Sequence, residues 1–400
     1  MGRRLWSTLL FAAGFVLASA CNVADVQFTN TTVPTLSGKP GSFDVLEIDQ
    51  ANHRLYLTDR TNQGIDVFDI SSATASFVQT IALPSSPNGL AIAPDLGRLF
   101  VGASSGSVLI VDIDPRSPTA GTAVQDVKTG GTEADLLDYS AARQEVYASN
   151  AKDGTIASIN ATTGEVKAHY KVGSVLEQPR FNPADGMLYV TSPVAKALFQ
   201  IDPSNGSIKI NTLLDKCRPG GLAINPRSNQ ALIACAASVI SLDLRSGKRE
   251  AFDQVPGVDV VTYNAKVDRF FAAAPGRRAN AQVGMFGGNP IAYIGVVATT
   301  AGGKAAAYDQ TNNVVYTPDM RLNHAGLTSF RRPSSDDISP SFVMSMGAVV
   351  AFITAVGYVL YLLARSADPI HRHIAEEEQA AAAAAKQRPK RAAVDGMVNN

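Results

Sequence analysis

The sequence is poor in the residues on which metal, thiol and haem chemistry depend. Its 400 residues include three cysteines and five histidines, and no Cys-x-x-Cys or Cys-x-x-Cys-His motif occurs. The chain therefore carries no signature of a zinc site, a thiol-redox centre or a c-type haem. It also lacks a cofactor fingerprint and a nucleophile paired with a base, so no catalytic class is indicated.

The chain also has no net charge. Thirty-five basic residues balance 35 acidic ones, and charged residues make up 18% of the chain. Nucleic-acid binding depends on a basic field that releases counterions from phosphates, and this composition argues against it. The hydrophobic share of 46% is high enough to build a folded core over most of the chain.

What the chain does contain is one β-hairpin pattern, repeated seven times. Apolar residues run up to Phe181, an Asn-Pro-x-Asp-Gly turn follows, and Leu188–Val190 is a β-prone return strand. A strand-end residue and a return-strand residue eight positions later recur as Ile48/Tyr56, Ile92/Phe100, Tyr139/Tyr147, Phe181/Tyr189, Ile224/Leu232, Tyr263/Phe271 and Tyr308/Tyr316. Successive copies start 39 to 47 residues apart, which is the period of four-stranded propeller blades. The pattern predicts an all-β, seven-bladed β-propeller over residues 21–330.

Short motifs within the repeats resemble a known family. Four segments are similar to the tetrapeptide of the YVTN-repeat β-propellers, the type known from surface-layer proteins: Tyr56–Asp59, Tyr147–Asn150, Tyr189–Ser192 and Tyr316–Asp319. Asn88–Pro94 and Leu222–Pro226 resemble the start of that family's hairpin. The likeness covers residues 41–330 and weakens in the sixth blade, where Ala272–Ala274 replaces the motif. It implies a propeller in an extracytoplasmic setting, and it implies no single activity.

The last blade is one strand short. It offers strands at Lys304–Asp309, Val314–Thr317 and Ala325–Phe330, where four are expected. The β-prone stretch Val26–Val33 near the N-terminus is too short to stand alone. We predict that it closes the ring as the outermost strand of this blade, which removes an open sheet edge.

The N-terminal segment has the features of an export signal. Residues 1–20 carry Arg3 and Arg4, an apolar run over Leu9–Leu17 and the small residues Ala18–Ala20. They predict a secretory signal peptide. Two outcomes stay open, cleavage at the A-x-A site or lipidation of Cys21, whose surroundings are near a bacterial lipobox. A bacterial origin is the expectation.

The C-terminal part predicts attachment to the cytoplasmic membrane. A linker at 331–341 leads to Phe342–Ala364, a run without charge that predicts a single transmembrane helix. Residues 365–400 form a basic tail on the cytoplasmic side. Gly347, Ala351 and Ala355 lie on one face of the helix and predict close packing against itself or another membrane protein.

One position in each repeat predicts a ring of polar side chains. Four residues before each strand-end residue stand Asp44, Asn88, Asp135, Glu177, Gly220, Asp259 and Lys304. Inner strands line a propeller's channel, so these side chains are expected at its mouth. They would suit Ca²⁺, or a cationic or polyhydroxyl ligand. The alternative is that they are ordinary polar residues facing channel water. No other cofactor is expected.

Two cysteines fall within one repeat. Cys217 and Cys235 could form a disulfide in an oxidising compartment. A hairpin with Ile224 opposite Leu232 would place Cys235 opposite Gly221, so the bond requires residues 218–220 to fold back.

The function that these patterns favour is a non-catalytic binding or scaffold module outside the cytoplasmic membrane. Its predicted role is that of an accessory subunit of a membrane protein complex. One alternative is a metal-dependent hydrolase or lactonase that uses the acidic ring. A further alternative is a ligand sensor that signals through the membrane helix.

Overall fold

The computed structural model describes residues 26–214, 216–276, 280–331, 352–363 and 373–383. The chain divides into two compact units, residues 1–332 and 333–400, which are described separately. The predicted signal peptide at 1–20, Cys21, Gly347 and Ala351 lie outside the described residues, as do most of the linker and of the tail.

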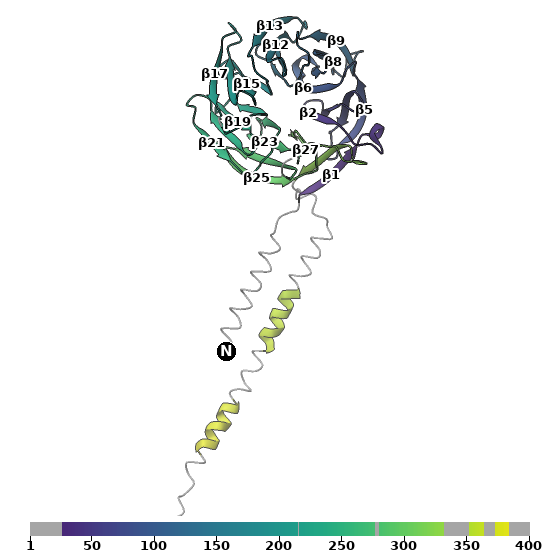
Figure 1. Ribbon diagram of the computed structural model, residues 1–400. Coiled ribbons are helices and arrows are strands. Elements are labelled where there is room, and N and C mark those ends of the chain that lie inside the picture. Colours follow the sequence, from purple (N-terminus) through teal and green to yellow (C-terminus); the bar gives the residue numbers. More distant parts are fainter. Residues whose placement is uncertain (1–25, 215, 277–279, 332–351, 364–372, 384–400) are drawn as a thin grey trace, which may run out of the picture. The chain divides into compact units, whose positions relative to one another are not determined.

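The first unit consists of seven four-stranded antiparallel sheets arranged around a ring (Figure 1). The innermost strands are β2 (Phe43–Asp49), β6 (Pro87–Ala93), β10 (Leu137–Ser140), β14 (Pro179–Asn182), β18 (Leu222–Asn225), β22 (Val260–Asn264) and β26 (Ala307–Asp309). The second strands are β3 (Arg54–Asp59), β7 (Arg98–Ala103), β11 (Glu145–Asn150), β15 (Met187–Ser192), β19 (Gln230–Ala234), β23 (Arg269–Ala274) and β27 (Val314–Asp319). The predicted seven-bladed propeller is confirmed.

The outer half of each blade has the same regularity. The third strands are β4 (Gly64–Asp69), β8 (Ser107–Asp112), β12 (Thr155–Asn160), β16 (Ala197–Ile201), β20 (Val239–Asp243), β24 (Gln282–Gly287) and β28 (Gly326–Arg331). The outermost strands are β5 (Ser76–Ala82), β9 (Thr122–Lys128), β13 (Val166–Lys171), β17 (Ile208–Leu213), β21 (Arg249–Phe252), β25 (Ala292–Ala298) and β1 (Gln27–Thr32). Two short 3-10 turns, η1 (Pro34–Leu36) and η2 (Pro94–Leu96), follow β1 and β6. We number the blades 1 to 7 in the order β2–β5, β6–β9, and so on.

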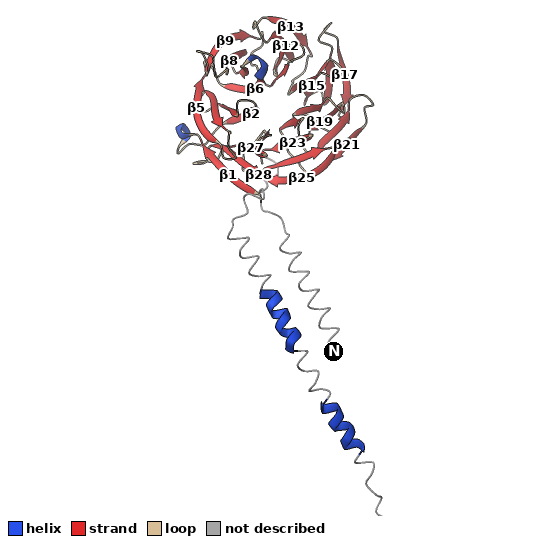
Figure 2. Cartoon of the chain, turned by 180° about the vertical axis from the view of Figure 1, so that it is seen from behind, coloured by secondary structure: helices blue, strands red, loops and turns tan. Residues whose placement is uncertain are grey.

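Strand β1 closes the ring in the way that the sequence predicts. It pairs antiparallel with β28 from Gln27 opposite Arg331 to Thr32 opposite Gly326, and the order in blade 7 is β1-β28-β27-β26. The two strands lie side by side in Figure 2. The first and last strands of the propeller therefore share one sheet, and blade 7 obtains its fourth strand from the other end of the chain.

Burial explains why the second strands are rich in apolar residues. Every residue of β11 is buried, and β15 and β3 each have only their first residue partly exposed. Neighbouring blades cover both faces of these strands, which therefore need no alternation of polar and apolar residues. The outermost strand β25 instead alternates exposed and partly exposed side chains along its whole length.

The residue pairs of the repeat pack between blades. Within every hairpin the strand-end residue lies opposite the residue seven positions later, for example Phe181 opposite Leu188. The residue eight positions later packs against the strand-end residue of the next blade. At three junctions both residues are aromatic. These pairs are Phe100–Tyr139, Tyr147–Phe181 and Phe271–Tyr308, whose aromatic ring centroids lie 6.2, 5.9 and 5.5 Å apart. At the other four junctions the two residues share one apolar cluster: Tyr56 with Ile92, Tyr189 with Ile224, Leu232 with Tyr263, and Tyr316 with Ile48.

The second unit is described over two helices, residues 352–363 and 373–383. The first covers part of the predicted membrane span Phe342–Ala364, and Ala355 is exposed on it. Among the described residues, no helix is both long and apolar enough to cross a membrane.

Ring closure can be tested at Gly326, where a side chain would meet β1. A Cβ atom at this position would lie 2.2 Å from the carbonyl oxygen of Thr31, and the glycine φ is +149°. We expect Gly326→Ala to cost about 2–3 kcal/mol and to remove amide hydrogen-exchange protection from β1. The control is Gly186→Ala in a hairpin turn, where φ is +74° and no atom lies within 4 Å. Its cost should be about 1 kcal/mol, with β1 protection retained. Full protection of β1 in Gly326→Ala would contradict this closure.

Candidate functional site in the central channel

The polar residues predicted at the channel mouth occupy equivalent places in their blades. We call Asp44, Asn88, Asp135, Glu177, Gly220, Asp259 and Lys304 the upper ring. In four blades the backbone N–H of the ring residue donates to the carbonyl fourteen positions later, as Asp135 does to Ser149 and Glu177 to Thr191, at 2.8 and 3.0 Å. This shared register agrees with the prediction that the same position of each repeat contributes to one ring. It brings the side chains of several blades to the same end of the channel.

One side of the upper ring is a network of opposite charges. Asp44 accepts from Lys304 Nζ at 3.1 Å and forms a second ion pair with Arg60. Arg60 also donates to the side-chain oxygen of Asn88 at 2.9 Å and to the carbonyl of Pro87 at 3.1 Å. Lys304 therefore compensates the negative charge of Asp44. Both carboxylate oxygens of Asp44 are in contact with cationic side chains of the protein.

The network includes residues that the ring spacing did not identify. Asn88 donates to Glu133 Oε1 at 3.1 Å, and Glu133 forms an ion pair with Lys152. Arg60 stands four positions after Tyr56, where the other blades have Ser104, Ala151, Pro193, Ala236, Pro275 and Met320. Arg60 is the only charged residue at this position, so a comparison of equivalent positions would have singled it out.

Two carboxylates of the upper ring have no such partners. Within the part of the chain that the structure describes, no protein group donates a hydrogen bond to the carboxylate of Asp135 or Glu177. Burial raises the pKa of Asp135 to about 6, and the nearby Asp44 and Glu133 add to the effect. Burial also raises the pKa of Glu177 to about 7, with further contributions from Asp135 and Asp259. Because no described protein group donates to them, both carboxylates are available to accept hydrogen bonds from a ligand once they are ionised.

The metal-binding expectation has no direct support from the geometry. Over residues 26–331, apart from the undescribed positions, no three His, Cys, Asp or Glu side chains are grouped so that they could hold a metal ion. Asp44 is already occupied by two cationic side chains. Calcium binding stays a prediction.

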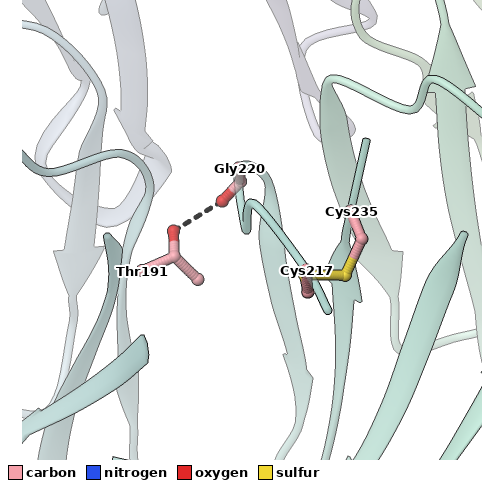
Figure 3. The surroundings of a disulfide bond; sticks show 4 residues. All are labelled: Thr191, Cys217, Gly220 and Cys235. Atoms are coloured by element: carbon pink, nitrogen blue, oxygen red, sulfur yellow. Dashed lines mark hydrogen bonds between the residues drawn. A yellow bond between two sulfur atoms is a disulfide. The ribbon is translucent and has the colours of Figure 1, made fainter. Parts of the chain in front are cut away.

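A disulfide lies directly beside Gly220 of the upper ring. Cys217 and Cys235 are bonded, with Cα atoms 5.1 Å apart, and both are buried (Figure 3). The chain folds back just before β18, where Cys217 N–H donates to the carbonyl of Leu214 at 2.8 Å. Thr191 Oγ1 donates to the carbonyl of Gly220 at 2.5 Å and ties this turn to blade 4.

The register expected for this hairpin was wrong by one residue. Ala223, not Ile224, lies opposite Leu232. The inner and second strands also stop pairing before Cys235, whose N–H donates to the carbonyl of Ser238. The bend between Cys217 and Gly220 provides the approach that the bond requires. A cavity of about 230 Å³ adjoins this bend and is lined by Glu177, Arg218 and Asp259, among others.

The raised pKa of Glu177 predicts how stability depends on pH. The folded state binds the proton up to about pH 7, whereas an unfolded carboxyl releases it near 4.5. The wild-type free energy of unfolding should therefore fall between these values, and Glu177→Gln should not share that fall. We expect the variant to be about 1 kcal/mol more stable than wild type at about pH 8 and equal to it at about pH 4, measured by urea unfolding. Glu165→Gln, at an exposed turn, is the control. An equal effect of Glu177→Gln at both pH values would contradict the assignment.

Comparison with known proteins supports the fold. No protein-family model matches the sequence, and no curated protein matches it. The structure is similar to a chain of hydrazine synthase from Kuenenia stuttgartiensis, with a TM-score of 0.60. The two are 14% identical, and the match covers 76% of this chain and 97% of the other. At this identity the likeness shows that the chain shares the propeller fold of that structure and nothing further.

Proposed function

We propose that the propeller is an extracytoplasmic, non-catalytic binding module, attached to the cytoplasmic membrane by its C-terminal segment as an accessory subunit of a membrane complex. The observation that carries the proposal is the disulfide between Cys217 and Cys235. Such bonds form and persist in oxidising compartments outside the cytoplasm. The apolar run Phe342–Ala364 and the signal peptide predicted for residues 1–20 support the same placement.

The chemistry of the channel supports binding as the role. The upper ring offers carboxylates, one amide and one amine, and none of its members is a histidine, a cysteine or a hydroxyl residue. The carboxylate of Asp44 forms ion pairs with Arg60 and Lys304. Asp44 is therefore occupied by cationic side chains of the protein. The open carboxylates of Asp135 and Glu177 favour contact with donors of a ligand or partner.

A metal-dependent hydrolase is the second candidate, and the same two open carboxylates favour it. Hard cations such as Ca²⁺ prefer carboxylate oxygens, and a bound cation would lower the pKa of both groups. If this candidate holds, millimolar calcium should raise the melting temperature of the full chain relative to chelator. Asp135→Asn should then reduce the difference at least twofold. An equal melting temperature in calcium and chelator would contradict calcium binding.

The proposed location can be tested by labelling two single-cysteine substitutions in whole cells. Lys248→Cys lies in an exposed turn of the propeller, and Gln379→Cys lies in the exposed helix at 373–383. With the full chain in a bacterial membrane, a membrane-impermeant maleimide should label Lys248→Cys in intact, outer-permeabilised cells. It should label Gln379→Cys only after lysis. Peptide mass spectrometry separates these sites from Cys21.

The native cysteines give an independent measurement in the same experiment. When the protein is denatured before labelling, Cys217 and Cys235 should stay unlabelled unless a reductant is added, because the bond blocks both thiols. Labelling of both native thiols in denatured protein without reductant would contradict the extracytoplasmic location. Equal labelling of the two introduced cysteines in intact cells would contradict the membrane topology.

A further inference from the structure

A second ring of side chains lines the channel three residues further along the inner strands. Each of its members lies directly opposite the return-strand residue of its own hairpin, so the seven positions are equivalent. This lower ring consists of Glu47, Ala91, Asp138, Arg180, Ala223, Thr262 and Ala307. Three of the seven members are charged and three are alanines.

The alanines leave space in the lower half of the channel. A cavity of about 400 Å³ is lined by every member of the lower ring except Ala91. Aromatic and aliphatic side chains such as Phe181, Ile224 and Phe271 share the rest of its wall with polar ones. The volume lies in the range of small-molecule sites, and the mixed lining suits a polar ligand.

Most polar side chains of the wall are already paired within the protein. Gln50 bridges to the backbone of Tyr308 and Gln310 at 2.8 and 3.0 Å. Thr262 Oγ1 donates to the carbonyl of Ala306 at 2.7 Å, and the Tyr263 hydroxyl donates to Asp268 at 2.8 Å. These groups are held in place by the protein and leave the charged members of the lower ring as the main points of contact.

The protein holds the guanidinium of Arg180 through one of its three nitrogens. Its Nη1 donates to the carbonyls of Leu137 and Pro179 at 3.0 and 3.1 Å and lies 3.4 Å from Asp138 Oδ1. Asp138 Oδ2 in turn accepts from the N–H of Phe181 at 2.7 Å. Among the described residues, Nε and Nη2 of Arg180 have no acceptor. The arginine is therefore positioned with two donor groups still available.

Glu47 supplies the opposite charge from the far side of the channel. It belongs to blade 1 and Arg180 to blade 4 of the seven, and both line the same cavity. No ion pair or hydrogen bond from the described residues reaches the Glu47 carboxylate. Burial raises its pKa to about 7, while Arg180 lowers it and Asp138 raises it. A carboxylate in this environment gains from a cationic donor.

We propose that the cavity binds a small zwitterion of the amino-acid class, whose ammonium group donates to Glu47 and whose carboxylate accepts from Nε and Nη2 of Arg180. Such a ligand satisfies both open groups at once. A bare amine would leave the arginine donors unsatisfied, and a bare carboxylate would leave Glu47 without a donor. The remaining volume, beside side chains such as Phe181 and Phe271, would take the ligand's side chain.

This inference names a ligand for the proposed binding role, and it rests on that role but not on the location of the protein. The titration described next can fail while the cysteine labelling succeeds, and the reverse also holds. The two results therefore distinguish a wrong ligand class from a wrong compartment.

The test is a titration of the purified full chain in mild detergent with each of the common L-amino acids. Thermal shift identifies the strongest ligand, and calorimetry then measures its Kd at about pH 7.5. We expect Glu47→Gln and Arg180→Lys each to weaken binding at least tenfold, because each removes one half of the recognition. Glu165→Gln, an exposed carboxylate outside the channel, should leave the Kd unchanged.

Two further measurements distinguish ligand recognition by Glu47 and Arg180 from a loss of binding caused by misfolding of the variants. Ala223→Leu retains all the charges but fills part of the cavity, and it should weaken binding at least tenfold in a folded protein. Wild-type affinity should fall roughly tenfold between about pH 7.5 and 5.5, as Glu47 takes up its proton, and Glu47→Gln should lose this dependence.

Three results would overturn the proposal. The first is the absence of binding for every amino acid at millimolar concentration. The second is an unchanged Kd in both Glu47→Gln and Arg180→Lys. The third is a simple alkylamine or carboxylic acid that binds as tightly as the corresponding amino acid, which would assign the cavity to a ligand of one charge.

Discussion

The contact on which the structure depends is the packing of each blade's return-strand residue against the strand-end residue of the next blade. It occurs as an aromatic pair in Tyr147–Phe181, whereas Tyr189 and Ile224 share one apolar cluster. A single four-stranded sheet has no other partner for the fully buried faces of strands such as β11. Apolar burial is therefore completed only when all seven blades are present. This is why β1 must return to blade 7.

Closure of the ring also creates the channel and decides what can face it. Inner strands of neighbouring blades lie next to one another, so a single position in the repeat becomes a circle of side chains. Apolar packing between blades leaves these positions free to vary. Lys304 stands in blade 7 where Asp44 stands in blade 1, and the two pair across the junction at 3.1 Å. The upper ring thus contributes to closure as well as to the chemistry of the channel mouth.

Each ring contains a carboxylate without a donor in the described part of the protein, and the two rings lie three residues apart along the inner strands. Asp44 in the upper ring is held by Arg60 and Lys304, whereas Glu177 lacks a donor among the described residues. In the lower ring Asp138 and Arg180 form an ion pair, and Glu47 lines the same cavity of about 400 Å³.

The sequence by itself determined the number of blades, the strand order and the closing strand, because each depends on local periodicity and on counting strands. It also placed the upper ring, since equivalent repeat positions must share one place. Only the tertiary structure decided the rest. Arg60 and Glu133 reach the ring from outside the inner strands, and the turn before β18 brings Cys217 to Cys235 against the expected register. Glu47 and Arg180 are separated by 133 positions in the sequence and meet one cavity. Repeat spacing specifies which positions are equivalent, but the partner of a side chain depends on distances across blades, which only the folded chain defines.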